Sequence, residues 1–201
     1  GTRGRRASAI GRSEPVVSEP RYLFPKRYSD FVQRFRVAGG FLLLIVFAWL
    51  PQPTRASLIA GLAIAVAGLW LRGWAAGHLA KNEQLAISGP YAYMRNPLYA
   101  GTLIAALGMV IAARSVWLGV LFAVVFLFVY LPAIELEEQH LRVIFPEYAA
   151  YAQRVQRFLP LAKWRGRAAR FSWKQYWRNE EYKAAAGFVI AASWLVIRFR
   201  S

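Results

Sequence analysis

The sequence contains no cysteine, and this absence excludes several kinds of chemistry. A chain without thiols has no disulfide, no thiolate nucleophile and no cysteine-ligated metal. Histidine is almost as scarce, because only His78 and His140 are present, too few to indicate a histidine metal cluster. We therefore expect no thiolate chemistry and no metal site.

Acidic residues are also scarce, and the excess of basic residues indicates a class of partner. The 201 residues include 10 Asp and Glu against 26 Lys and Arg, for a net charge of +16, yet 57% are hydrophobic. The apolar residues form blocks with the charges between them, which is typical of a membrane protein rather than of one soluble core. Basic residues beside apolar blocks fit anionic lipid headgroups better than nucleic acid, so we expect a bilayer and no nucleic-acid partner.

Five apolar blocks predict an all-α, polytopic membrane helix bundle. They span residues 37–50, 56–71, 98–113, 116–134 and 184–197. A spanning helix needs about 20 residues, and only the fourth block approaches that length without help from flanking side chains. We expect four to five transmembrane helices with cytoplasmic amphipathic helices, the first and last blocks being the weakest and open to a tilted or re-entrant placement.

The distribution of basic residues predicts the orientation. With the N-terminus in the cytoplasm, segments 1–36, 77–97 and 135–183 lie inside and carry 9, 2 and 10 Lys or Arg. The outside loops then carry only Arg55 and Arg114, in agreement with the positive-inside rule. We predict a bacterial inner-membrane protein whose polar segments meet on the cytoplasmic face.

The predicted organisation has three parts. Residues 1–36 form a basic arm with a surface helix, residues 37–162 form the membrane core, and residues 163–201 form a basic interfacial helix followed by an apolar helix. The arm has no apolar stretch ending in a small-residue cleavage site, so we expect no signal peptide.

The segment GPYAYMRNPLYAG, residues 89–101, interrupts the apolar sequence. Pro97 is placed to begin the third helix, whose free amides attract anions, and Arg95 adds a guanidinium that can bind a carboxylate. A glycine at position 101 lets a ligand or another backbone come close. The alternative is an interfacial loop anchored by Tyr91, Tyr93 and Tyr99.

A second segment, residues 134–160, begins where the fourth block leaves the membrane. Three of the ten acidic residues, Glu135, Glu137 and Glu138, gather there. One interpretation is a solvated helix end that pairs with Arg142. The other is that one or two of these carboxylates bind a cationic ligand group.

One ligand carries groups that match both segments. S-adenosylmethionine has a carboxylate for Arg95 and the helix start, and an ammonium for Glu137 or Glu138. Tyrosines and nearby apolar residues fit its adenine. The two segments together therefore indicate an S-adenosylmethionine pocket.

The same two segments resemble a known family. GPYAYMRNPLYAG resembles the GPY-x-Y-x-R-H-P-x-Y-x-G signature of integral-membrane methyltransferases, which include isoprenylcysteine carboxyl methyltransferase and the phospholipid N-methyltransferases. EEQHLRVIFPEYAAYAQRVQRFLP resembles their E-E-x-x-L-x-x-x-F-G-x-x-Y-x-x-Y stretch. The resemblance covers about residues 55–162 and implies a cytoplasmic S-adenosylmethionine pocket that a lipid or lipidated substrate reaches from the bilayer.

The resemblance also implies roles for individual residues. The expected cofactor-binding residues are Gly89, Tyr91, Tyr93, Arg95, Asn96, Pro97, Tyr99, Gly101, Glu137 and Glu138. Of these, Glu138 and Arg95 are the expected catalytic residues. Apart from the resemblance, residues 81 and 82 precede the first motif and are expected at the mouth of the pocket. The expected substrate-binding residues are His78, Lys81, Asn82, Tyr148 and Arg154, although a histidine at this position, near the end of the second helix, more often has a structural or interfacial role.

Two positions depart from the family pattern. Asn96 stands where the family has histidine, so a proton-shuttling role at that position is excluded in this chain. Pro146 stands where glycine is expected and the spacing is one residue short, which leaves the orientation of Tyr148 open.

Two other functions remain open on the sequence alone. Related membrane folds include reductases of sterol-like lipids, and Arg154 and Arg157 could bind the extra phosphate of a nicotinamide cofactor. A non-catalytic membrane scaffold is the third possibility. The segment 164–183 is expected to form a helix lying on the membrane, which could serve as a lid over the cofactor or the substrate gate. The sequence names neither the methyl acceptor nor the oligomeric state.

Overall fold

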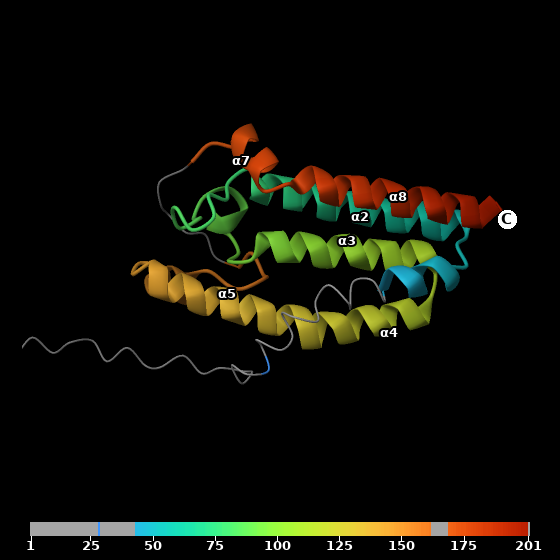
Figure 1. The fold of residues 1–201 in the computed structure, drawn as a ribbon, viewed down its shortest axis with the longest axis horizontal. Helices are drawn as coiled ribbons and strands as arrows, with labels where there is room; N and C mark the ends of the chain where they lie inside the picture. Colours follow the sequence, from blue (N-terminus) through green and yellow to red (C-terminus); the bar gives the residue numbers. More distant parts are fainter. Residues whose placement is uncertain (1–27, 29–42, 162–168, 201) are drawn as a thin grey trace, which may run out of the picture.

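The computed structural model describes Tyr28 and residues 43–161 and 169–200, and the regular elements in this part of the chain are helices joined by loops (Figure 1). Its elements are α2 (Arg55–Ala76), the 3-10 turn η1 (Gly89–Ala92), α3 (Pro97–Ala113), α4 (Val116–Val125), the π-helical turn η2 (Phe126–Tyr130), α5 (Leu131–Ile144), α6 (Tyr148–Arg154), α7 (Trp173–Arg178) and α8 (Glu181–Arg200). The expected all-α class is confirmed. Most of the predicted N-terminal arm lies outside the described residues.

In the described part of the chain, three helices are long and apolar enough to cross a membrane, which indicates an integral membrane protein. They are Arg55–Ala76, the continuous run Val116–Ile144 and Glu181–Arg200. A fourth apolar helix, Pro97–Ala113, has 17 residues. Of the four to five spans expected, three are thus confirmed and a fourth, shorter helix is present. In the first apolar block, the structure describes a helical stretch at 43–49.

The helices α2 and α3 pack at the distance that only glycine allows. An ideal Cβ on Gly61 would lie 2.3 Å from the backbone nitrogen of Ala112, and one on Gly108 would lie 2.4 Å from that of Ala65. Gly68 and Gly101 approach the opposite helix in the same way. Small residues bring helix backbones together in membranes, where apolar burial gives little driving force. We call these four glycines the α2–α3 glycine contact.

The helix after α3 extends further than the sequence predicts. The fourth apolar block ends at residue 134, two residues after Pro132, but the helix continues to Ile144. A proline lacks the N–H that would pair four residues back, with the carbonyl of Phe128. The π-helical turn widens the helix just before the proline, and the Tyr28 hydroxyl donates to the Phe128 carbonyl at 2.9 Å. The carbonyl is satisfied and the helix continues.

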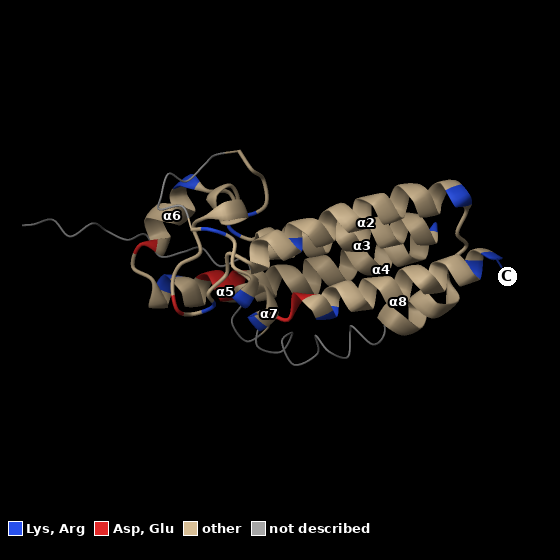
Figure 2. Cartoon of the chain, turned by 90° about the horizontal axis from the view of Figure 1, so that it is seen from above, with Lys and Arg blue, Asp and Glu red and all other residues tan. Residues whose placement is uncertain are grey.

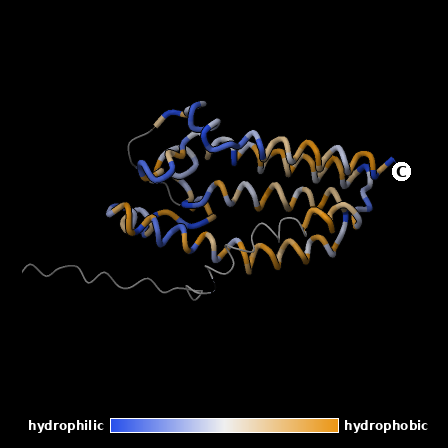
Figure 3. Tube along the Cα trace, viewed as in Figure 1, coloured by the Kyte–Doolittle hydropathy of each residue, from blue (hydrophilic) through white to orange (hydrophobic). Residues whose placement is uncertain are grey.

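Polar residues gather at one end of the bundle, where the α2–α3 connection, α5, α6 and α7 meet (Figures 2 and 3). The long helices leading away from that end are mainly hydrophobic (Figure 3). The helix α8 starts at the polar end and finishes at the opposite end, beside the start of α2 (Figure 1). Arg198 and Arg200 therefore join Arg55 at the end that the sequence predicted to be poor in charge.

Candidate functional site

A short backbone pairing joins the two predicted motifs. Met94 and Gln156 form an isolated parallel bridge. The amide of Arg95 donates to the Gln156 carbonyl at 2.9 Å, and the amide of Asn96 donates to the Arg157 carbonyl at 3.1 Å. Because these bonds link segments some 60 residues apart, the start of α3 and the segment after α6 lie side by side.

Asn96 and Pro97 begin α3 as the sequence predicts. Asn96 is the N-cap residue with φ −126° and ψ 55°, a conformation outside the helical region, and Pro97 is the first helical residue. A proline needs no partner for an amide at this position, and its fixed φ favours the first turn. Just before this first turn, the side chains of Arg95 and Asn96 reach Glu138 on α5.

The carboxylate of Glu138 is surrounded by cationic and amide groups. Asn96 donates its side-chain amide to Oε1 at 2.8 Å, and Arg157 donates Nη2 to Oε2 at 2.8 Å. The Arg95 guanidinium lies 3.2 Å from Oε1. We call these four residues the Glu138 cluster. Only 5% of Glu138 is exposed, so the partners replace the water that a buried carboxylate would lose.

The Glu138 cluster contains two guanidinium groups and one carboxylate, which leaves one net positive charge. Arg95 also donates Nη1 to the carbonyl of Ala152 at 2.8 Å, so its orientation is fixed from α6 as well as from α5. Because Arg95 also lines the neighbouring cavity, this charge favours an anionic ligand group there.

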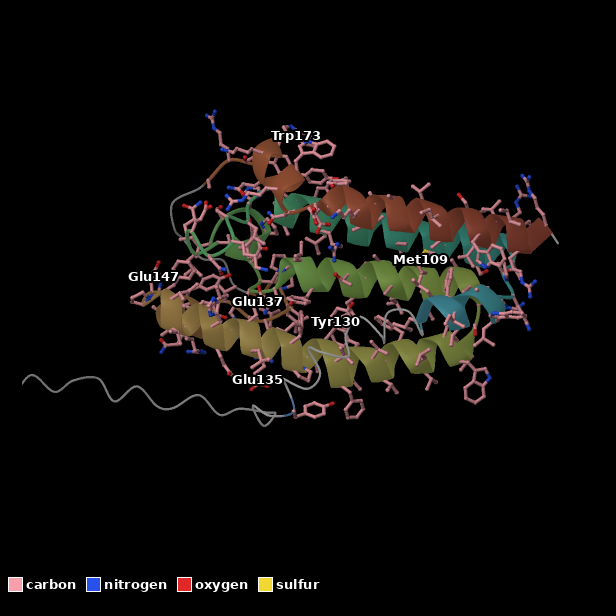
Figure 4. All side chains as sticks on the ribbon, viewed as in Figure 1. Met109, Tyr130, Glu135, Glu137, Glu147 and Trp173 are labelled. Atoms are coloured by element: carbon pink, nitrogen blue, oxygen red, sulfur yellow. The ribbon has the colours of Figure 1, made fainter. Side chains whose placement is uncertain are left out.

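Glu137, the neighbour of Glu138, has a different environment. Tyr99 donates its hydroxyl to Glu137 Oε2 at 2.8 Å. Among the described residues, no Lys, Arg or His lies within ion-pair distance of this carboxylate. Figure 4 shows Glu137 between α5 and the start of α3, whereas Glu135 lies on the other side of α5. Glu137 therefore presents a negative charge that no described cation neutralises.

A cavity of about 520 Å³ lies between these elements. This volume falls within the range of roughly 300–1,000 Å³ typical of small-molecule sites. Its lining residues are Leu79, Lys81, Asn82, Gln84, Leu85, Ala86, Tyr91, Arg95, Asn96, Leu98, Tyr99, Ala133, Leu136, Glu137, His140, Leu141, Phe145, Tyr148 and Tyr151. The cavity thus joins apolar and aromatic walls with a cation at Arg95 and an anion at Glu137.

Three buried tyrosines line the cavity. Burial raises the pKa of the Tyr91, Tyr148 and Tyr151 phenols, so all three are neutral hydrogen-bond donors at cellular pH. Tyr151 donates to the carbonyl of Tyr91 at 2.7 Å. The buried hydroxyl of Tyr148 has no hydrogen-bond partner in the described part of the protein. A buried unpaired hydroxyl costs free energy, which indicates a place for a ligand acceptor.

The cavity brings together eight of the predicted site residues. These are Lys81, Asn82, Tyr91, Arg95, Asn96, Tyr99, Glu137 and Tyr148. Gly89, Tyr93, Pro97, Gly101, Glu138, His78 and Arg154 do not line it. Gly101 serves the approach of another backbone, because a Cβ there would lie 2.7 Å from the Gly68 carbonyl oxygen. Arg157, named from the sequence only for a nicotinamide phosphate, proves to be a partner of Glu138.

His78 packs behind the cavity wall. Its Nδ1 lies 3.0 Å from the Trp74 carbonyl, and since a carbonyl only accepts, this nitrogen carries the proton. A Cβ on Gly89 would lie 2.7 Å from the imidazole of His78. Gly89 also has a φ of +57°, a backbone conformation that residues with a side chain rarely adopt. The glycine that begins the first motif is thus required both by its backbone angle and by the His78 ring.

Comparison with known proteins agrees with this geometry. Residues 56–148 match the phospholipid methyltransferase family. The match covers this segment and not the whole chain. The resemblance read from the two motifs is therefore confirmed over those residues, which include the first motif and the whole acidic cluster. No solved structure matches the chain.

Two curated relatives are similar over about half of the chain. The cobalt-zinc-cadmium resistance protein CzcN of Cupriavidus metallidurans is 36% identical over 108 residues, 53% of this chain and 49% of that protein. The nickel-cobalt-cadmium resistance protein NccN of Alcaligenes xylosoxydans xylosoxydans is 32% identical over 101 residues, 50% of this chain and 46% of that protein. The chain thus spans about half the length of these relatives. Its described residues contain no group of three His, Cys, Asp or Glu that could bind a metal ion.

Proposed function

We propose that the protein is an S-adenosylmethionine-dependent methyltransferase acting on a lipid or lipidated molecule in the bilayer, with its site on the cytoplasmic face. The observation that carries the proposal is the pair of opposite charges on one 520 Å³ cavity, Arg95 beside Asn96 and Glu137 beside Tyr99. An amino-acid group has a carboxylate and an ammonium on one carbon, so it complements both.

In this proposal, Glu138 and Glu137 have different roles. Glu138 already accepts hydrogen bonds from Asn96 and Arg157 on its two oxygens, so its part is to fix the orientation of Arg95 and Asn96. Glu137 lines the cavity and fits the ammonium of the cofactor. The aromatic and apolar walls around Tyr148 and Phe145 fit the adenine.

The sulfonium of S-adenosylmethionine supplies an activated methyl group, so the protein needs chiefly to bind, orient and exclude water. The lone pair of the acceptor forms a bond to the methyl carbon while the carbon–sulfur bond breaks and its electrons return to sulfur. Asn96 cannot titrate, and the pKa of the Tyr148 phenol is raised by burial. A carboxylate or a thiolate acceptor needs no base, whereas an amine acceptor would have to give its proton to one of the other lining groups, Glu137 or His140.

A nicotinamide-dependent reductase is the rival function, and the geometry weakens its case. The extra phosphate of NADPH requires free cations, but Arg157 makes two hydrogen bonds to Glu138 and Arg154 is outside the cavity lining. Binding of that phosphate by Arg157 would therefore require breaking its hydrogen bonds in the Glu138 cluster.

Calorimetry on the purified protein in detergent tests the proposal. We expect S-adenosylhomocysteine to bind and NADPH not to bind. In membranes that contain the protein, a labelled methyl group from S-adenosylmethionine should appear in the lipid fraction, and membranes without the protein are the control. Binding of NADPH without S-adenosylhomocysteine would overturn the proposal in favour of the reductase.

A further inference from the structure

The segment 171–181 contacts the end of α2 from outside the family domain. Asn179 donates both hydrogens of its side-chain amide, one to the Ala76 carbonyl and one to the Leu79 carbonyl, each at 2.9 Å. The amide of Ser172 donates to the Gly77 carbonyl at 2.9 Å. The Ala76 carbonyl is the last of α2 and also accepts from the Leu79 amide at 3.3 Å, whereas the Gly77 and Leu79 carbonyls follow the helix. These bonds therefore hold the start of the α2–α3 connection against the segment 171–181.

Two further contacts bind the same place. The Phe171 ring covers Gly77 so closely that a Cβ there would lie 2.0 Å from it, and it meets the His78 ring edge-on at 6.0 Å between centroids. Arg178 forms an ion pair with Glu83 at 2.5 Å, in the middle of the α2–α3 connection. This pair is half exposed, so it contributes little free energy by itself.

A buried ion pair fixes α8 beside α2. Arg72 Nη2 lies 2.6 Å from Glu181 Oε1 and its Nε lies 3.0 Å from Oε2, a bidentate arrangement, and Arg72 also donates to Thr102. Glu181 is 6% exposed. A bidentate pair with little exposure determines geometry strongly, so the residues just before α8 have a fixed position.

The stretch that receives these contacts is one wall of the cavity. Leu79, Lys81 and Asn82 line the cavity, and so do residues 84–86. No described residue of 169–200 lines it. Among the described residues, the segment 171–181 therefore acts on the cavity through the end of α2 and the α2–α3 connection, and not by direct contact.

We propose that Asn179 is a positioning residue: by binding the carbonyls of Ala76, at the end of α2, and Leu79, just after it, Asn179 fixes the wall formed by residues 79–86 and thereby the affinity of the cavity for its ligand. The family domain at 56–148 then depends for its site geometry on a residue that follows it. The effect on ligand affinity rests on the proposed function, whereas the effect on the wall does not.

Hydrogen exchange and calorimetry on the full chain test this inference with Asn179→Ala. We expect amides in 77–86 to exchange about ten-fold faster, the order that two lost hydrogen bonds allow. The dissociation constant for S-adenosylhomocysteine should rise about ten-fold, with little change in the melting temperature. Lys183→Gln is the matched control, because it removes an exposed ion pair with Glu180 and touches no wall residue.

Each result decides between the alternatives. Unchanged exchange in 77–86 overturns the inference, and so does faster exchange with unchanged affinity. If Asn179→Ala does not fold, Asn179→Leu makes the same test, since it keeps a side chain of similar size and removes both hydrogen-bond donors. If the wild-type protein does not bind S-adenosylhomocysteine, the proposed function falls, and the exchange rates alone decide whether Asn179 fixes the wall.

Discussion

The α2–α3 glycine contact and the Glu138 cluster lie at different positions along the bundle and are stabilised in opposite ways. At the contact, backbones approach so closely that a single Cβ on Gly61 would lie 2.3 Å from a neighbouring nitrogen. At the cluster, charged side chains surround a cavity of about 520 Å³. The close packing of the α2 and α3 backbones therefore stabilises the fold. The long polar side chains at the other region enclose a cavity that has room for a ligand.

Removing the charge of Glu138 should have the largest effect on both stability and binding. In Glu138→Gln, Arg95 and Arg157 lose their shared anion, and breaking a buried ion pair costs about 3–5 kcal/mol. We expect the protein to lose about 3 kcal/mol of stability and S-adenosylhomocysteine affinity to fall about a hundred-fold. Thermal unfolding and calorimetry measure the two effects.

A second substitution sharpens that result. Adding Arg157→Gln to Glu138→Gln removes one of the two uncompensated cations, so the double variant should be more stable than the sum of the single effects predicts. Additive effects would show that the Arg157 and Glu138 side chains do not act on each other.

The second largest effect should appear at the α2–α3 glycine contact and concern stability alone. In Gly61→Ala, the new Cβ would overlap the backbone at Ala112, and overpacking of this kind costs about 1–3 kcal/mol. We expect a lower melting temperature with unchanged affinity for S-adenosylhomocysteine. Gly187→Ala is the control, because a Cβ at Gly187 has nothing within 4 Å. A large loss of affinity in Gly61→Ala would contradict the separation of the two regions.

Glu137→Gln should show the reverse, a loss of binding without a loss of stability. The change removes the negative charge from the cavity but keeps an oxygen that can accept from Tyr99. A ligand ammonium would lose its ion pair, so the dissociation constant for S-adenosylhomocysteine should rise about ten-fold. An analogue that lacks the amino group should bind wild type and Glu137→Gln equally. If the variant discriminates against that analogue as strongly as wild type does, Glu137 does not bind the ammonium.

Local signals in the sequence predicted the start of α3 and the residues on either side of the cavity. Pro97 fixed the helix start, and the scarcity of acids drew attention to Glu137 and Glu138. The division of roles between the two glutamates was beyond prediction. It depends on which face of α5 meets Arg157, and that arginine reaches the cluster through a backbone pairing between residues far apart in the chain.

Two other features had misleading or weak signals. Pro132 usually ends a helix, but the π-helical turn and the Tyr28 hydroxyl let the helix continue to Ile144. Asn179 stands in a segment that indicated only a surface helix, and nothing local shows that its amide reaches the end of α2. Non-local contacts of this kind follow from the packing of whole helices.

Tyr148 should give the smallest effect and the sharpest test of the tyrosine side of the cavity. Tyr148→Phe removes a buried hydroxyl that has no described partner, so the free protein should keep its stability or gain slightly. If a ligand acceptor occupies this position, the dissociation constant for S-adenosylhomocysteine should rise about three- to five-fold.

Burial raises the pKa of this phenol, so it is neutral in the fold up to and beyond the ordinary tyrosine value of about 10. Wild type and variant should therefore show the same pH dependence of binding between about pH 6 and 9, because only the hydrogen bond and no ionisation is lost. If wild type and Tyr148→Phe bind S-adenosylhomocysteine with equal affinity, the polar atoms of the ligand lie away from Tyr148. Recognition of the ligand would then depend on Arg95 and Glu137.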